Sequence, residues 1–205
     1  MLMRDYAADP CRASSLPFWK AESVTVPPCL SILRDDEFSA LSPQGKDEPY
    51  FKLIHHLKAI PSPALPEGFA IVPCDIPGFA RHINSCYQEE GVSQEELAAY
   101  QSHPVYAPDL WIALAETESG RIAATGIGEM DARIGEGVLE WIQVSPEYRR
   151  RGLGAFLVCE LLRRMRGRAR FITVSGRVNS ESCPLALYRS CGFENPVIWH
   201  VVAKG

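Results

Sequence analysis

The chain has 205 residues, of which 46% are hydrophobic and 22% charged, a balance that is ordinary for a soluble globular protein. A formal net charge of −4 argues against the broad basic surface that nucleic acids require, so we expect no nucleic-acid partner. No apolar run approaches the roughly 20 residues of a membrane-spanning helix, and the first residues lack the apolar stretch of a secretion signal. We therefore expect a cytoplasmic protein with no membrane partner.

Seven scattered cysteines form no Cys-x-x-Cys pair, and their number is odd. Without a secretion signal, such cysteines indicate free thiols in a reducing compartment rather than a disulfide framework. The adjacent His55 and His56 point to different sides of a strand, and the other histidines are isolated. Histidine spacing of this kind predicts no bound metal.

The first 60 residues are rich in proline and aromatic side chains, and we assign residues 1–60 to an N-terminal arm of uncertain fold. Residues 23–26 and 30–33 are compatible with strands, whereas residues 50–60 fit either a strand or a short helix. The arm is too apolar to be disordered, so we expect it to pack on the rest of the chain or on a second subunit. Residues 61–67, Pro-Ser-Pro-Ala-Leu-Pro-Glu, are typical of a linker.

Short β-rich and helical segments alternate over residues 68–205, in the pattern of one α/β domain. A capping box from Ser93 to Glu96 begins one helix, and Pro184 begins another that Gly192 ends. Turn residues at 118–120 join two strands into a hairpin. The predicted strands are 69–72, 110–115, 122–130, 138–144, 171–174 and 197–202, with a further strand left open at Phe193. The predicted helices are 76–89, 93–100, 154–166 and 184–190.

Residues 144–154, Val-Ser-Pro-Glu-Tyr-Arg-Arg-Arg-Gly-Leu-Gly, join a predicted strand to a predicted helix. Several backbone N–H groups that face one point at a helix N-terminus make a site for a pyrophosphate. Gly152 and Gly154 let the phosphates approach where a Cβ would block them. Ala155 stands where a P-loop needs Lys, and Leu157 stands where a dinucleotide fingerprint needs a small residue, so both of these phosphate loops are excluded.

The spacing Arg149-x-x-Gly152-x-Gly154 after a strand resembles the pyrophosphate-binding motif of the GNAT superfamily of acyl-CoA-dependent N-acetyltransferases. The element order β-α-α-β-β-β-α-β-α-β also resembles that superfamily from about residue 68 to the end, roughly two thirds of the chain. The resemblance implies an α/β (α+β mixed) fold, with a central, mostly antiparallel sheet flanked by helices and an N-terminal arm. It also implies acetyl-CoA as co-substrate without a metal, and it says much less about the acyl acceptor.

The resemblance further implies how the coenzyme binds. The strand at 138–144 separates from its neighbour, and its free backbone groups pair with the amides of the pantetheine arm; the alternative is a fully paired central strand. Asn179 matches an Asn that binds the same arm in many relatives, but its spacing to the last helix is longer here and a simple turn Asn is equally supported. The predicted coenzyme-binding residues are Ile142, Gln143, Val144, Arg149, Arg150, Arg151, Gly152, Leu153, Gly154, Ala155 and Asn179.

An alkylamine with a pKa of about 10.4 is neutral in about one molecule in two thousand at pH 7, so a base must take its proton. Glu140 is our candidate, because residues 140, 142 and 144 share the strand face that leads to the expected thioester position. Acids are frequent at this place before the motif in GNAT relatives. Glu129 and Glu136 are reserves, and the alternative is that Glu140 is a solvated or ion-paired strand residue.

Tyr188 lies in the segment Leu-Tyr-Arg-Ser-Cys-Gly-Phe, which resembles the family's Leu-Tyr-x-x-x-Gly-Phe segment. In the family this hydroxyl lies beside the coenzyme sulfur. A phenol with a pKa near 10 is a weak acid for a thiolate near 8.5, so Tyr188 is expected to donate a hydrogen bond to the departing sulfur or to relay a proton. The alternative is an ordinary tyrosine at the edge of the core.

Together these residues predict an N-acetyltransferase that moves an acetyl group from acetyl-CoA to a primary amine by direct attack in a ternary complex. The acceptor is a small-molecule amine, a protein N-terminus or a lysine, and a homodimer is left open. Acidic residues cluster from Glu129 to Glu140, which suits a cationic amine but also a solvated hairpin. Two alternatives stand: an acyl-CoA-binding module without turnover, and a protein-interaction module centred on residues 1–60.

Overall fold

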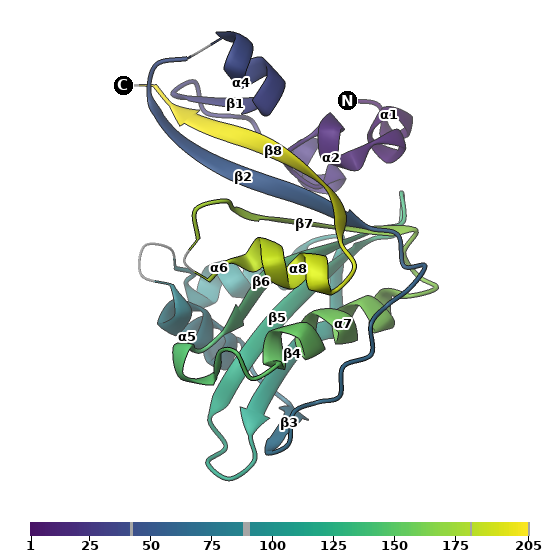
Figure 1. The fold of residues 1–205 in the computed structure, drawn as a ribbon, viewed down its shortest axis with the longest axis vertical. Helices are drawn as coiled ribbons and strands as arrows, with labels where there is room; N and C mark the ends of the chain where they lie inside the picture. Colours follow the sequence, from purple (N-terminus) through teal and green to yellow (C-terminus); the bar gives the residue numbers. More distant parts are fainter. Residues whose placement is uncertain (42, 88–90, 181, 205) are drawn as a thin grey trace.

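A computed structural model describes residues 1–41, 43–87, 91–180 and 182–204, which form one eight-stranded sheet with helices on both faces (Figure 1). The strand order is β1-β8-β2-β7-β6-β5-β4-β3, and among the described pairs only β6 and β7 run parallel. This mixed, mostly antiparallel sheet confirms the predicted fold class. The strands are β1 (Leu30–Arg34), β2 (Lys46–His55), β3 (Phe69–Val72), β4 (Tyr106–Glu116), β5 (Ile122–Asp131), β6 (Glu136–Val144), β7 (Phe171–Arg177) and β8 (Glu194–Ala203).

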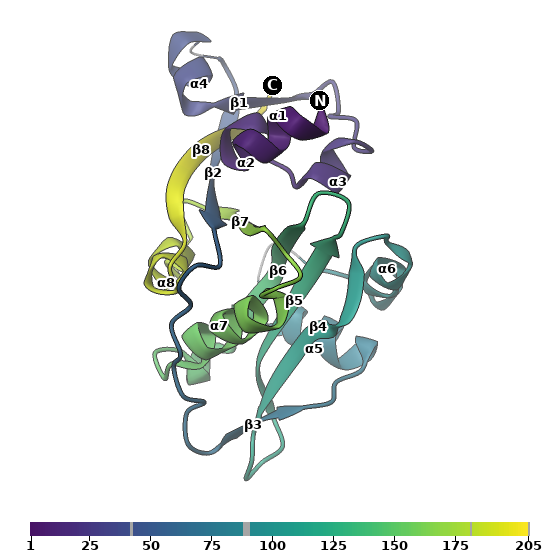
Figure 2. The same cartoon turned by 90° about the vertical axis from the view of Figure 1, so that its right-hand side faces the viewer.

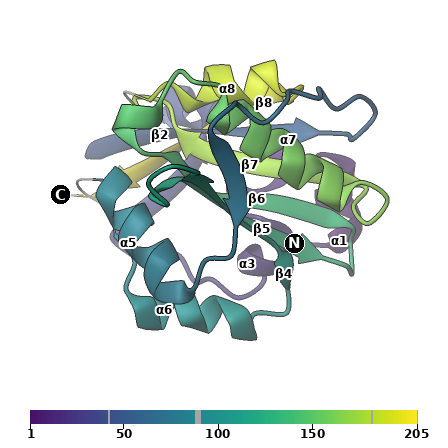
Figure 3. The same cartoon turned by 90° about the horizontal axis from the view of Figure 1, so that it is seen from below.

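Two pairs of helices cover the central strands from opposite sides (Figure 3). On one side Leu157, Leu161 and Leu162 bury the apolar face of α7 in the main core. On the other side α5 and α6 pack Phe79 and Leu97 against β4 and β5. The helices are α1 (Met3–Ala8), α2 (Pro10–Ala13), α3 (Phe18–Ala21), α4 (Asp35–Leu41), α5 (Ile76–Cys86), α6 (Gln94–Ala99), α7 (Leu153–Met165) and α8 (Pro184–Ser190).

Side-chain caps begin two of the helices, and the sequence analysis predicted the one at Ser93. Ser93 caps α6 through a complete capping box with Glu96, and Asp75 caps α5 by accepting a hydrogen bond from the Gly78 N–H at 2.8 Å. Each cap satisfies a backbone donor that has no partner inside its own helix.

Three sequence predictions differ from the structure. Residues 23–26 form no strand, because the two prolines that follow cannot donate to a ladder. Residues 50–60 extend as a strand only to His55, and that strand begins earlier, at Lys46. The predicted helix 76–89 ends at Cys86, and residues 88–90 lie outside the described residues.

Strand β2 comes from the predicted arm and lies inside the sheet, between β7 and β8 (Figure 1). Tyr50 pairs with Arg177 on one side and with Trp199 on the other. Phe51 and Leu53 are fully buried in the main core. The predicted arm therefore contributes a strand to the same sheet as the residues that follow the predicted linker at 61–67.

The N-terminal helices are tied to the sheet by a buried polar network. Lys52 of β2 donates from Nζ to the Tyr6 hydroxyl at 3.0 Å and to the backbone carbonyl of Leu16 at 2.8 Å. Tyr6 in turn donates to Glu136 at 2.6 Å. Burial lowers the pKa of Lys52 to about 8, whereas the charge of Glu136 opposes that shift. This network holds α1 to α3 against β2 and β6.

All seven cysteines are free thiols, as predicted. Among the described residues, none of the helices combines the length and the apolar character that crossing a bilayer requires.

Candidate active site

Strands β6 and β7 separate halfway along β6. Their parallel pairing runs from Glu136 opposite Phe171 to Leu139 opposite Val174 and goes no further. From Glu140 onward, β6 keeps its antiparallel partner β5, but no further ladder pair between β6 and β7 is found in the described part of the chain. This confirms the expected separation, and the alternative of a fully paired central strand is wrong.

A β-bulge interrupts β6 at the same point. Ile127 of β5 pairs with Glu140, but Thr125, two residues back, pairs with Gln143, so β6 carries one extra residue. Trp141 takes a left-handed φ of 46° inside this bulge. An extra residue inverts the alternation of side chains beyond it.

The bulge corrects the prediction that residues 140, 142 and 144 share one face. The register places Glu140 and Gln143 on the face that α5 and α6 cover, together with Ile127. Ile142 and Val144 instead pack into the main core under α7. The side chain of the candidate base, Glu140, therefore points to the opposite face of the sheet from the side chains of Ile142 and Val144.

The turn after β6 exposes the entrance of α7. A short 3-10 helix (Pro146–Tyr148) leads into Arg150 at φ 63° and Gly152 at φ 86°, and Gly152 is the N-cap of α7. Arg150 takes this left-handed conformation at a cost in backbone strain, whereas glycine at 152 takes it without that cost. The first N–H groups of α7 have no acceptor within the helix and form its positive end, so the entrance favours an anion.

Other residues of the motif hold this turn in place. The Arg149 Nε donates to the Val144 carbonyl at 3.2 Å, and the Arg151 guanidinium lies 4.8 Å from the Phe69 ring centroid. A Cβ added to Gly154 would lie 3.2 Å from Leu187 of α8. Gly154 therefore also permits the close approach of α7 and α8, a packing role that the sequence analysis missed.

Tyr188 lies in α8, 5% exposed, with its ring in edge contact with Phe51 and Phe193. Burial is the largest cause that raises the pKa of Tyr188, and the charges of Tyr87 and Glu140 add to it. The structure thus brings the Tyr188 phenol within electrostatic range of Glu140. A phenol with a raised pKa stays protonated and can donate a hydrogen bond.

Glu140 is ion-paired with a residue that the sequence analysis did not consider. The Lys20 Nζ of α3 lies 2.6 Å from a Glu140 carboxylate oxygen (Figure 2 shows α3 beside the β5–β6 hairpin). The neighbouring Trp19 donates from its indole N–H to Glu129 at 2.9 Å. Because 120 residues separate Lys20 from Glu140, no local sequence signal could have revealed this contact.

The two reserve acids differ from each other. Burial, and then the charge of Glu140, raise the pKa of Glu129 to about 7, while Lys20 and Trp19 oppose the shift. Glu136 instead accepts three hydrogen bonds, from the Tyr6 hydroxyl, the Thr173 hydroxyl and the Phe18 N–H. A carboxylate that is fully buried and bonded in this way is a structural clamp.

Asn179 follows β7 in an exposed turn. It lines a hollow of about 210 Å³ together with Arg177 and Lys46 to Pro49 of β2. This position places Asn179 beside the start of β2.

A buried histidine network supports the separated end of β6. His82 of α5 bonds to the Thr125 hydroxyl at 2.8 Å through Nδ1 and to the Ser145 hydroxyl at 2.9 Å through Nε2. Burial lowers the pKa of His82 to about 4, so the ring is neutral near pH 7. Gln143 bonds to the same threonine through its amide nitrogen, whereas its buried carbonyl oxygen has no partner among the described residues.

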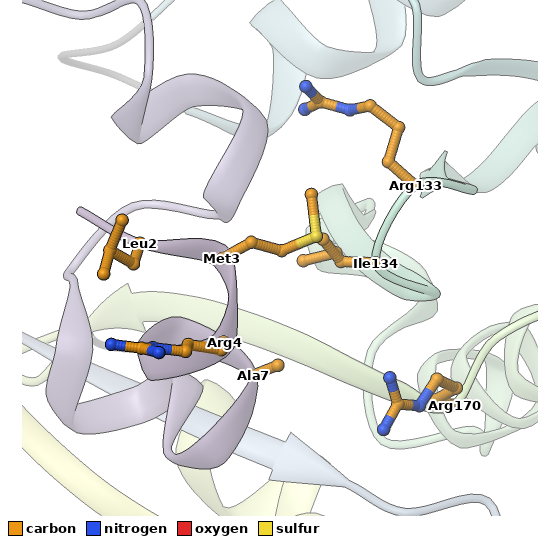
Figure 4. A pocket seen from close by; sticks show the side chains of 7 residues that line it. All are labelled: Leu2, Met3, Arg4, Ala7, Arg133, Ile134 and Arg170. Atoms are coloured by element: carbon orange, nitrogen blue, oxygen red, sulfur yellow. The ribbon is translucent and has the colours of Figure 1, made fainter.

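A second hollow, of about 500 Å³, lies between α1 and the β5–β6 turn (Figure 4). Figure 4 shows Met3 and Arg4 on one side and Arg133, Ile134 and Arg170 on the other. Its lining includes none of the predicted site residues.

A known family model matches most of the second half of the chain. Residues 108–195, from β4 to the start of β8, match the family model of the acetyltransferase (GNAT) domain. A search of curated proteins found no match.

Solved structures of similar fold include two GCN5-related N-acetyltransferases. The one from Sphaerobacter thermophilus has a TM-score of 0.69 and 23% identity, over 84% of this chain and 58% of that chain. The one from Kribbella flavida has a TM-score of 0.56 and 16% identity, over 86% of this chain and 68% of that chain. This chain thus spans little more than half the length of the first structure. The fold is shared and residues 108–195 match the family model, so the resemblance to the GNAT superfamily is confirmed.

Proposed function

We propose that the chain is an N-acetyltransferase that moves an acetyl group from acetyl-CoA to a primary amine by direct attack in a ternary complex. One observation carries this proposal: β6 leaves β7 after Leu139 and leads into the helix entrance at Gly152. A carrier with both amide groups and a diphosphate needs a free strand edge joined to an anion site.

The residues present fit this co-substrate. The backbone of Ile142 to Val144 would pair with its amide groups, and the N–H groups of Arg150 to Ala155 would hold its phosphates. When bound, the co-substrate supplies an acyl group activated as a thioester. The interaction of Asn179 with the coenzyme stays a prediction.

The side chains around the end of β6 suit the transfer step. Glu140 accepts a proton from the ammonium form of the acceptor, so that the neutral nitrogen attacks the acyl carbon. A backbone N–H near Val144 donates to the carbonyl oxygen as negative charge develops there. The C–N bond forms and the C–S bond breaks, while Tyr188 donates a hydrogen bond to the departing sulfur. Of the two protons that the ammonium loses, one ends on the thiol and one reaches solvent.

A second function, acyl-CoA binding without turnover, is favoured by one contact. The ion pair between Lys20 and Glu140 occupies the carboxylate that the transfer reaction needs. Release of the free coenzyme thiol, measured with a panel of amines, separates the two functions, because a binding module releases none.

Coenzyme binding is tested by a matched pair of glycine substitutions. Gly152 and Gly167 have φ of 86° and 81°, and no neighbouring atom clashes with an added Cβ at either position. Alanine introduces similar backbone strain at both, but only Gly152→Ala changes the entrance of α7. We expect Gly152→Ala to weaken acetyl-CoA binding by about tenfold in calorimetry, and Gly167→Ala to leave it unchanged. Absence of binding to the unmodified chain at millimolar acetyl-CoA would refute the proposed function.

A further inference from the structure

A built cation site surrounds the ammonium of Lys20. Besides its 2.6 Å contact with Glu140, the Lys20 Nζ lies 5.3 Å from the centroid of the Trp19 ring. Trp19 also holds the second carboxylate, Glu129, through its indole N–H. We call Glu129, Glu140 and the Trp19 ring the cation seat.

The electrostatics of the cation seat favour a charged amine over a neutral one. Burial by itself disfavours the Lys20 ammonium, but the charges of Glu140 and then Glu129 outweigh it and raise the pKa of Lys20. Tyr100 contributes in the same direction. An alkylammonium in this place is therefore held by the Glu140 carboxylate, by Glu129 in its ionised form and by an aromatic face.

The cation seat lies on the same face as a polar atom that has no partner among the described residues. The β5–β6 register places Glu140 and Gln143 on one face, with Gln143 nearer to the turn that precedes α7. Gln143 is 6% exposed, and its carbonyl oxygen has no hydrogen bond within the described part of the chain. A buried acceptor of this kind calls for an N–H donor. An amine that moves from the seat toward the end of β6 supplies one.

Lys20 can vacate the seat without moving α3. Phe18 anchors this helix, because its side chain is buried and its N–H donates to Glu136 at 3.0 Å. Trp19 is held by Glu129. The Lys20 side chain is 22% exposed and flexible, so rotation of its own bonds brings the ammonium into solvent.

We propose that the cation seat binds the primary alkylammonium group of the acceptor, and that Lys20 is an internal occupant which the acceptor displaces. The transfer step of this inference rests on the proposed function, whereas binding of the cation does not. An unbranched amine such as a lysine side chain or the end of a polyamine suits the seat. An α-amino acid does not, because its carboxylate would lie close to two glutamates.

The first test measures binding of n-butylammonium by calorimetry in the absence of acetyl-CoA. Lys20→Met keeps the apolar stem and removes the charge, and Lys58→Met removes an exposed lysine outside the seat. We expect Lys20→Met to bind n-butylammonium about tenfold more tightly than the unmodified chain, and Lys58→Met to match the unmodified chain. Neutral n-butanol should bind to none of them. Equal n-butylammonium affinities in all three proteins would overturn the proposal. If Lys20→Met does not fold, Lys20→Gln replaces it as the variant that lacks the lysine charge.

The second test separates the seat from the transfer reaction. With acetyl-CoA present, Lys20→Met should lower the KM for n-butylamine by about tenfold and leave the KM for acetyl-CoA unchanged. Tighter n-butylammonium binding without any thiol release would support the seat while refuting the proposed function. Thiol release with unchanged n-butylamine affinity and KM would refute the seat alone.

Discussion

The two halves of β6 differ in how completely their polar groups are paired. From Glu136 to Leu139 the strand is paired on both sides, and the carboxylate of Glu136 is saturated by donors from α1, α3 and β7. From Glu140 to Val144 one edge is without a ladder, and Gln143 keeps a polar atom unpaired among the described residues. The saturated half fixes the position of the open half, so that backbone groups can stay available for a ligand at little cost in rigidity.

The largest expected effect comes from the open half. Glu140→Gln keeps the size of the side chain but removes the proton acceptor, so kcat/KM for the amine should fall by about a hundredfold or more. Thermal unfolding should change little, because the Glu140 side chain is 24% exposed and its partner Lys20 can turn to solvent. Steady-state thiol release measures the effect, with Glu147→Gln, an exposed acid paired with Arg121, as the control. Undiminished kcat/KM in Glu140→Gln would exclude Glu140 as the base.

The matching change in the saturated half should act on stability. Glu136→Gln leaves the buried Lys52 charge without its carboxylate and disrupts the bond from Tyr6, so the free energy of unfolding should fall by about 3 kcal/mol. Urea unfolding measures it, again with Glu147→Gln as the control. At temperatures where the variant is folded, acetyl-CoA should still bind. Lost coenzyme binding in a folded Glu136→Gln protein would mean that the two halves are not separable.

The same contrast explains how far the sequence could predict this molecule. The turn at Gly152, the capping box at Ser93 and the start of α8 at Pro184 were predictable, because each depends on residues within a few positions of one another. The bulge at Trp141 was not, because a strand is assumed to alternate until its register with the neighbour is known.

Long-range placement accounts for the rest. The insertion of β2 between β7 and β8 joins segments that are more than a hundred residues apart. The contact of Lys20 with Glu140 depends on that insertion and on the Lys52 network that anchors α1 to α3. A composition rich in proline and aromatic residues predicts packing for such an arm but not its partner.

A smaller effect is expected at the boundary of the two halves, where Glu129 lies opposite Val138. The pKa of Glu129 is raised from 4.5 to about 7, so the folded chain holds this proton more tightly than the unfolded chain does. The resulting stabilisation is fully present below about pH 4.5 and is lost as the pH rises through about 7.

Glu129→Gln removes this pH dependence. Between about pH 5.5 and 8, the unfolding free energy of the unmodified chain should fall by about 2 kcal/mol relative to Glu129→Gln, as measured by urea unfolding at each pH. A difference between the two proteins that stays constant over this range would show that Glu129 is ionised throughout. In that case the cation seat would carry two negative charges even in mild acid.

The smallest expected effect tests the link between Tyr188 and the open half. Tyr188→Phe keeps the edge contacts with Phe51 and Phe193 but removes the hydroxyl, so stability should be almost unchanged. A hydrogen bond to a departing thiolate that forms in the transition state is worth about 1.4 kcal/mol, so kcat should fall by about tenfold while the KM for the amine stays the same. If the phenol acts only on leaving sulfur, the double variant Glu140→Gln/Tyr188→Phe should lose the product of the two single effects. A double variant no slower than Glu140→Gln would instead mean that Tyr188 works through the base, on the proton that Glu140 accepts.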